Sequence, residues 1–152
     1  MAVLIRSAEL NDVPLLAQMN DRLVEDQGSQ NPFSLRDLEQ RFSEWLETGA
    51  YQIDVVLEHD QIVGYTVYQQ RSDYYYSDQK VVYVRHFYIE REKRGRGLGR
   101  AAFQMLVQTR FPKGHAITLD VVATNLTGQS FWSKLGFTPY FIAMKRQDGG
   151  QS

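Results

Sequence analysis

The chain has 152 residues and contains no cysteine. This absence excludes disulfides, thiolate zinc sites, iron–sulfur clusters and cysteine nucleophiles at once. Its 17 basic and 18 acidic side chains give a net charge of -1, whereas proteins that bind duplex nucleic acid usually carry a clear basic excess. No segment approaches the roughly 20 apolar residues of a membrane span, and the apolar run at the N-terminus is too short for a signal peptide. We expect a cytoplasmic protein whose partners include neither nucleic acid nor membrane.

The sequence also lacks the patterns of two common kinds of catalytic site. Its histidines, His59, His86 and His115, fall on separate predicted elements without the spacing of metal ligands, so we predict no metal site. No serine stands in a Gly-x-Ser-x-Gly turn. Apolar residues make up 43% of the chain and aromatic residues 12%, which is enough for the core of one domain. We predict a single domain over residues 1–146 and a flexible tail over residues 147–152.

Hydrophobic periodicity predicts an α/β (α+β) protein in which helices flank a mixed, mostly antiparallel sheet. Ser34 and Asp37 form a capping-box pattern at the start of the second helix, and Gly49 is placed to end it. The predicted strands are 3–8, 51–58, 61–70, 81–90, 115–123 and 137–145, and the predicted helices are 12–25, 34–49, 97–109 and 127–135. The element order is therefore β-α-α-β-β-β-α-β-α-β.

The segment most informative about function is a glycine-rich turn between the fourth predicted strand and the third predicted helix. It runs from Gly95 to Gly99 (GRGLG), with Arg94 before it and Arg100 after it. Glycines allow a tight turn and the close approach of a ligand to backbone N–H groups. The first turn of a helix adds unpaired N–H donors and a partial positive charge. With three arginines nearby, the pattern predicts a site for a phosphate or pyrophosphate.

Three classes of phosphate-binding loop compete for this turn. The Gly-x-x-x-x-Gly-Lys-Ser/Thr pattern of a P-loop is missing. The dinucleotide pattern Gly-x-Gly-x-x-Ala is satisfied from Gly97 to Ala102, and Asp120 lies at about the distance of a ribose-binding acid. That fold places its first glycine directly after a strand, whereas Glu90 to Arg94 intervene here, and Asp120 falls inside the next predicted strand. NAD binding is therefore the weaker alternative.

The third class accounts for more of the chain. Arg94-x-x-Gly97-x-Gly99 resembles the Gln/Arg-x-x-Gly-x-Gly/Ala signature of the GNAT superfamily of N-acetyltransferases. Asn125 follows the next predicted strand, as an asparagine does in the family, and residues 131–137 (FWSKLGF) resemble its Phe-Tyr-x-Lys-x-Gly-Phe segment. Residues 20–32 resemble the acceptor-side helix and loop of one branch of these enzymes. The family's element order matches the predicted order along nearly the whole chain.

The resemblance implies that acetyl-CoA, or another acyl-CoA, is the co-substrate. It places the pyrophosphate on the backbone N–H groups of the glycine turn, and the pantetheine arm along the end of the fourth strand, which would splay from the fifth. Asn125 would contact that arm or order the following turn, and two aromatic residues would line the exit side. The implied binding residues are Phe87, Tyr88, Ile89, Arg94, Gly95, Arg96, Gly97, Leu98, Gly99, Arg100, Asn125, Phe131 and Trp132.

The resemblance also implies direct attack of an amine on the thioester within a ternary complex. Two positions depart from the family's acid–base pattern. Tyr83 stands where many members have a glutamate base, and Trp132 stands where a tyrosine acid is common, although an indole donates no useful proton to a thiolate. Three explanations stay open: the base lies elsewhere, water carries the proton, or the domain binds CoA without catalysing transfer.

Substitute catalytic groups can be named from the predicted elements. Strand alternation predicts that Tyr83 shares a face with Phe87, so Tyr83 is a candidate to relay a proton through water. Glu25 and Asp26 end the first helix near the expected acceptor mouth, where they would attract a cationic amine. Tyr140 is a candidate acid.

We therefore expect an N-acyltransferase that moves an acetyl group from acetyl-CoA to a primary amine of a small molecule or peptide. The alternative is a non-catalytic acyl-CoA-binding module, such as a sensor or a partner subunit. Dimers are common in the family, so a homodimer is an open expectation for the quaternary structure. An exposed rim of tyrosines, 74–76, is a further candidate for contact with the acceptor.

Overall fold

A computed structural model describes residues 2–28 and 31–148 and contains one five-stranded sheet. The strands lie in their sequence order and are antiparallel, except that the last two are parallel. This arrangement confirms the predicted fold class. The strands are β1 (Val3–Ser7), β2 (Gln52–Glu58), β3 (Gln61–Ser72), β4 (Lys80–Ile89) and β5 (Ala116–Leu119).

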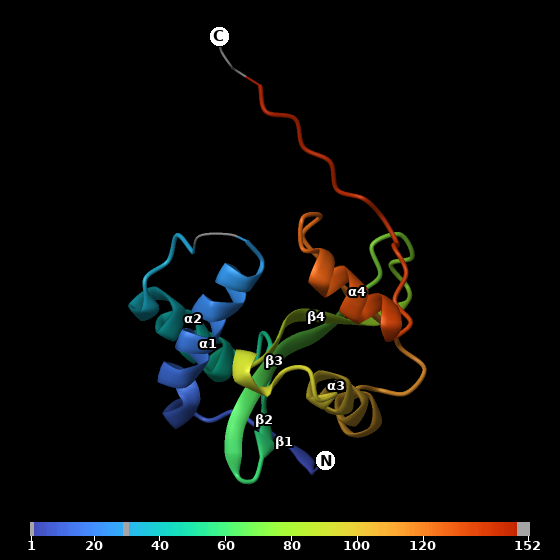
Figure 1. The fold of residues 1–152 in the computed structure, drawn as a ribbon. Coiled ribbons are helices and arrows are strands. Elements are labelled where there is room, and N and C mark those ends of the chain that lie inside the picture. Colours follow the sequence, from blue (N-terminus) through green and yellow to red (C-terminus); the bar gives the residue numbers. More distant parts are fainter. Residues whose placement is uncertain (1, 29–30, 149–152) are drawn as a thin grey trace.

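Two pairs of helices cover the two faces of the sheet (Figure 1). Leu16 and Phe42, from the first pair, pack against Val55 and Tyr65 of the sheet in one core. The third helix packs on the opposite face, where Leu106 lies among residues of β3 and β4. The helices are α1 (Val13–Asp26) and α2 (Leu35–Thr48) on one face and α3 (Leu98–Thr109) and α4 (Leu126–Lys134) on the other, with short 3-10 turns η1 (Leu10–Asp12) and η2 (Arg91–Lys93).

The helix ends follow the predicted capping residues. Ser34 Oγ accepts a hydrogen bond from Asp37 N at 3.1 Å, and Asp37 Oδ2 accepts one from Ser34 N at 3.2 Å, which completes the capping box. Gly49 ends α2 with a φ of 71°, a left-handed conformation that glycine adopts without strain. None of the described helices is both long and apolar enough to cross a membrane.

A β-bulge in β4 changes which residues share a face of the sheet. His86 pairs with Val67 and Val84 pairs with Tyr68, so Arg85 is one extra residue on β4. The alternation reverses at this point, and Phe87 joins Val84 in the core beneath α3. The prediction that Tyr83 shares a face with Phe87 is therefore wrong, because simple alternation assumes that no residue is inserted.

The parallel strands β4 and β5 diverge at the same bulge. Their pairing runs from Val81 with Ala116 to Val84 with Leu119, and β5 ends there. β5 is thus shorter than the predicted strand 115–123, and Asp120 lies just beyond its end. β4 continues alone from Arg85 to Ile89 on this side. We call the opening between the end of β5 and this unpaired edge the fork.

The predicted last strand, 137–145, is wrong. Within the described part of the chain, residues 137–148 join no strand, and the sheet ends at β5. The segment has an apolar sequence, but a strand requires a partner edge. Beyond Phe141 it leads away from the body of the molecule (Figure 1), with Ile142 78% and Met144 91% exposed. Of the predicted tail, residues 149–152 lie outside the described residues.

Candidate functional site

The glycine turn presents a row of free backbone donors beside the fork. Gly95 and Gly97 have φ values of 82° and 80°, so the turn depends on a conformation that other residues rarely adopt. The first hydrogen bond of α3 runs from Ala101 N to Gly97 O at 3.0 Å. Across the described residues, the six N–H groups from Gly95 to Arg100 have no acceptor in the protein. Such a row suits an anion at a helix N-terminus.

Two of the three arginines around this turn are already paired. Arg94 binds Asp26 Oδ2 at 2.5 Å and donates to Ile89 O at 2.8 Å, and Arg96 binds Glu58 at 2.9 Å. Over residues 2–28 and 31–148, Arg100 has no carboxylate within 4.0 Å. The affinity of the turn for an anion therefore depends chiefly on its N–H groups and on Arg100.

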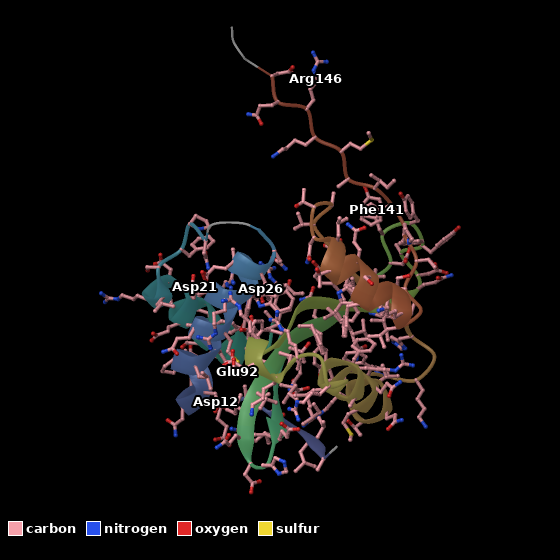
Figure 2. The ribbon with its side chains drawn as sticks, in the orientation of Figure 1. Asp12, Asp21, Asp26, Glu92, Phe141 and Arg146 are labelled. Carbon is pink, nitrogen blue, oxygen red and sulfur yellow. The ribbon has the colours of Figure 1, made fainter. Side chains whose placement is uncertain are left out.

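Asp26, which is labelled in Figure 2, occupies a different environment from the one predicted. Its carboxylate binds both Arg94 and Arg91, the latter at 2.9 Å, and so ties the end of α1 to the segment after β4. Glu25 is exposed and lies 3.8 Å from Arg91. Because arginines already neutralise these carboxylates, we no longer expect Glu25 and Asp26 to attract a cationic amine.

An aromatic cluster joins α4 to the fork. Trp132 lies within 5.4 Å of the rings of Phe87, Phe103, Phe131 and Phe137, measured between centroids. A Cβ added at Gly99 would lie 3.2 Å from the ring of Phe131, so the glycine lets α4 approach the start of α3. The indole of Trp132 is thus a packing group. Asn125 caps α4 by accepting from Gly128 N at 3.0 Å, which is the turn-ordering role that the resemblance implied.

Tyr83 lies at the base of the fork and connects its two strands. Its hydroxyl donates to Asp120 Oδ2 at 2.8 Å, and the guanidinium of Arg71 lies 3.7 Å from its ring centroid. Burial, together with this hydrogen bond to a carboxylate, raises the pKa of Tyr83 to about 12. At neutral pH Tyr83 is therefore a neutral phenol that donates toward Asp120.

Tyr140 lies at the opposite end of β4 from the glycine turn. Its hydroxyl donates to both carboxylate oxygens of Asp73, at 3.0 and 3.2 Å, in the loop between β3 and β4. Next to it, Phe141 stacks on Tyr74 with 5.1 Å between centroids, and Figure 2 shows Phe141 beside this loop. The structure therefore does not bring Tyr140 or the tyrosine rim to the fork.

His86 points from the bulge toward α2 and is surrounded by aromatic rings. Its ring centroid lies 6.2 Å from Phe42, 5.9 Å from Trp45 and 5.8 Å from Tyr65. The Tyr65 hydroxyl lies 3.1 Å from Nδ1 of His86. Burial, with two nearby arginines, lowers the pKa of His86 to about 3. His86 is therefore neutral at neutral pH, and its Nδ1 shares a hydrogen bond with the Tyr65 hydroxyl.

This burial predicts a pH dependence of stability. The pKa of His86 falls from 6.5 in the unfolded chain to about 3 in the folded protein, so the unfolded chain takes up a proton first as pH falls. The stabilisation is complete above pH 6.5 and declines below it. Between pH 7 and pH 5 we expect the free energy of unfolding to fall by about 2 kcal/mol more in the wild type than in His86→Gln. Urea unfolding at both pH values measures this difference, and equal losses would contradict it.

Sequence reasoning missed two arginines beside His86. Arg41 lies on α2 and Arg85 is the bulge residue of β4, and both guanidinium groups lie over the ring of Trp45. No sequence signal connects them, because their segments are far apart in the chain. The bulge that brings Arg85 to this position is also invisible to strand periodicity.

Comparison with known proteins gives a family match over most of the chain. The model of the acetyltransferase (GNAT) family matches residues 16–137, which include the glycine turn and the segment 131–137. A search of curated proteins found no match.

Solved structures share the fold over nearly their whole length. A predicted acetyltransferase with acetyl-CoA from Clostridium acetobutylicum has a TM-score of 0.74 at 20% identity, with 96% of each chain covered. A possible acetyltransferase from Clostridium difficile 630 has a TM-score of 0.76 at 16% identity, covering 99% of this chain and 100% of that one. A ribosomal-protein-alanine N-acetyltransferase from Brucella melitensis biovar Abortus 2308 has a TM-score of 0.72 at 15% identity, covering 97% and 100%. At these identities the likeness shows the fold alone.

Proposed function

Since the chain belongs to the GNAT family of acetyltransferases, we propose that it transfers an acetyl group from acetyl-CoA to a primary amine of a small molecule or peptide. The observation that carries the proposal is the fork, whose free strand edge lies next to a row of free N–H groups. An extended amide-containing arm and a pyrophosphate are the two chemical features that such an edge and such a row would bind.

The orientation of the β4 backbone supports this fit. Glu90 N donates to Val63 O on β3 at 2.9 Å, so residues alternating with Glu90 turn their N–H and C=O groups toward β3. Phe87 and Ile89, which lie between them, therefore direct these groups away from β3 and toward the fork, where Ile89 O already accepts a hydrogen bond from Arg94. The side chain of Ile89 lies 3.7 Å from a Cβ added at Gly99, so the strand edge and the glycine turn meet.

Acetyl-CoA supplies an activated acetyl group as a thioester, and its thiolate is the leaving group when an amine attacks. The protein then has to hold the two reactants together, polarise the carbonyl oxygen and remove the proton of the attacking amine. The N–H groups of Phe87 and Ile89 are the donors available to that oxygen at the fork. Tyr83 is the candidate to relay the proton, since a water can pass the amine's proton to the phenol oxygen while the phenol gives its own proton to the carboxylate of Asp120, which ends the step as a neutral acid.

The alternative, a non-catalytic acyl-CoA-binding module, draws on Trp132. This residue stands at the usual position of the tyrosine acid, and its indole packs among four aromatic rings. Release of free CoA from acetyl-CoA with a panel of amines distinguishes the two functions. Release that depends on an amine supports the enzyme, whereas binding without release for any amine supports the module.

The first test is thermal unfolding with acetyl-CoA, with NAD and ATP as controls. A ligand at about 100 times its dissociation constant stabilises the folded state by roughly 2.7 kcal/mol. For a domain of this size, that corresponds to a rise of roughly 5–10 °C in the midpoint. We expect the rise with acetyl-CoA alone. A rise with NAD alone would favour the dinucleotide reading, and no rise with acetyl-CoA would overturn the proposed co-substrate.

A further inference from the structure

The two arginines beside His86 form a cationic cluster on the α2 side of the fork. The guanidinium carbon of Arg41 lies 4.8 Å from the ring centroid of Trp45, and that of Arg85 lies 5.1 Å from it. Arg85 also donates to the Tyr51 hydroxyl at 3.1 Å, and Arg41 donates to Asn20 Oδ1 at 3.0 Å. Two like charges therefore share one indole, and among the described residues both guanidinium groups form hydrogen bonds only with uncharged groups.

This cluster lacks the carboxylates that balance other arginines near the site. Arg22 pairs with Glu90, Arg91 and Arg94 pair with Asp26, and Arg96 pairs with Glu58. In the part of the chain that the structure describes, neither Arg41 nor Arg85 has a carboxylate within 4.0 Å.

Two further features leave the positive charge of Arg41 and Arg85 uncompensated. Arg41 Nε is buried and, within residues 2–28 and 31–148, has no hydrogen-bond partner. His86 beside the pair is neutral and brings no negative charge. Arg41 is partly buried, Arg85 beside it is exposed, and both are positively charged. A partly buried cation that faces a like charge and retains a free donor is costly unless an anion joins it.

The position of Arg85 connects this cluster to the reaction. Arg85 follows Val84, the last β4 residue that pairs with β5, so it begins the unpaired edge. Phe87, whose N–H faces the fork, is only two residues further on. An anion bound by Arg85 therefore lies next to the place where the amine has to meet the thioester.

Resting on the acyltransferase function proposed above, we infer that the acceptor is a small amine of the amino-acid class, whose carboxylate is bound by Arg85 and Arg41. Guanidinium groups bind carboxylates and phosphates through paired N–H donors. A phosphate has more oxygen atoms to satisfy than a carboxylate, and the cluster adds only the Tyr51 hydroxyl to its two cations. The carboxylate is therefore the better match. This assignment replaces the cationic acceptor that Glu25 and Asp26 had suggested.

The test compares each of the standard L-amino acids with its own carboxamide. The two share the side chain and the amine, but the carboxamide lacks the negative charge. Its amine is also less basic, so without recognition of the carboxylate the carboxamide would be the better acceptor. Release of CoA from acetyl-CoA gives kcat/KM for each pair, and thermal unfolding of the protein with each compound gives binding independently of turnover.

We expect one or more amino acids to exceed their carboxamides about 10- to 100-fold in kcat/KM, the effect of charge-assisted hydrogen bonds. Arg85→Gln should remove this preference while the thermal shift with acetyl-CoA is retained. Arg36→Gln is the matched control, since it removes one positive charge from an exposed position on the same helix as Arg41.

The outcomes separate the acceptor from the acyltransferase function. Carboxamides that equal or exceed every acid, with acetyl-CoA binding intact, would overturn the carboxylate and leave the function standing. If acetyl-CoA does not bind, the proposed function fails, and the thermal shifts with acids and carboxamides still decide the anion site. Phosphoethanolamine acting in place of the acids would show that the anion is a phosphate. An equal loss in Arg36→Gln would reduce the effect to general charge and also overturn the inference.

Discussion

Gly97→Asp is expected to lower the affinity for acetyl-CoA by at least about 100-fold. Gly97 precedes α3 and carries one of the N–H groups proposed to hold the pyrophosphate. A carboxylate here would repel the phosphates, and two unit charges about 5 Å apart repel each other by on the order of 3 kcal/mol at an effective dielectric constant of about 20. Isothermal titration with acetyl-CoA measures the loss.

A matched control for this variant exists in the same chain. Gly114 has a φ of 81° against 80° for Gly97, and a Cβ at either position meets nothing within 4 Å. Gly114→Asp therefore adds the same charge and the same backbone strain at a position between α3 and β5. We expect Gly114→Asp to bind acetyl-CoA like the wild type. Unchanged affinity in a folded Gly97→Asp protein would overturn the placement of the pyrophosphate.

Trp132→Ala is expected to lower the free energy of unfolding by about 3 kcal/mol, the lower end of the range for an aromatic residue because Trp132 is only partly buried. The substitution would remove the ring around which Phe87, Phe103, Phe131 and Phe137 pack. In a domain of this size, the midpoint would fall by roughly 6–12 °C. Circular dichroism should follow the transition, because the chain has 2 tryptophans and the variant loses one from the fluorescence signal.

Trp132→Phe separates packing from chemistry at the same position. It keeps an aromatic ring but removes the indole N–H, so we expect a stability loss below about 1.5 kcal/mol. Turnover should stay within about threefold of the wild type if the residue only packs. A loss of several hundredfold with unchanged binding of acetyl-CoA would assign the indole a part in the reaction.

Local sequence signals predicted the helices accurately. Each helix begins and ends within one residue of its prediction, because caps such as Ser34 and Gly49 act on their own neighbours. The glycine turn was equally readable, since its glycines are required by its own backbone. These features depend on residues that are adjacent in the chain.

The features that the sequence did not predict depend on distant partners. Asp26 is balanced by arginines that follow β4, and Arg41 meets Arg85 across the interface between α2 and the sheet. Segment 137–145 has the composition of a strand, yet no edge pairs with it in the described residues. The bulge at Arg85 requires a register, which exists only once β3 and β4 are paired.

At the bulge, the backbone requirement for an extra residue is independent of the side chain that this residue carries. The fork requires that one extra residue stand between Val84 and His86, whatever its side chain, because an insertion alone bends the strand. The side chain at that position is exposed and outside the regular pleat, so it is free to change without disturbing the core. A descendant of this protein could therefore exchange the charge of Arg85 and acquire a different acceptor in a single mutational step. In such a lineage, the number of residues in β4 would be inherited with the fold, while the identity of residue 85 would diverge with the substrate.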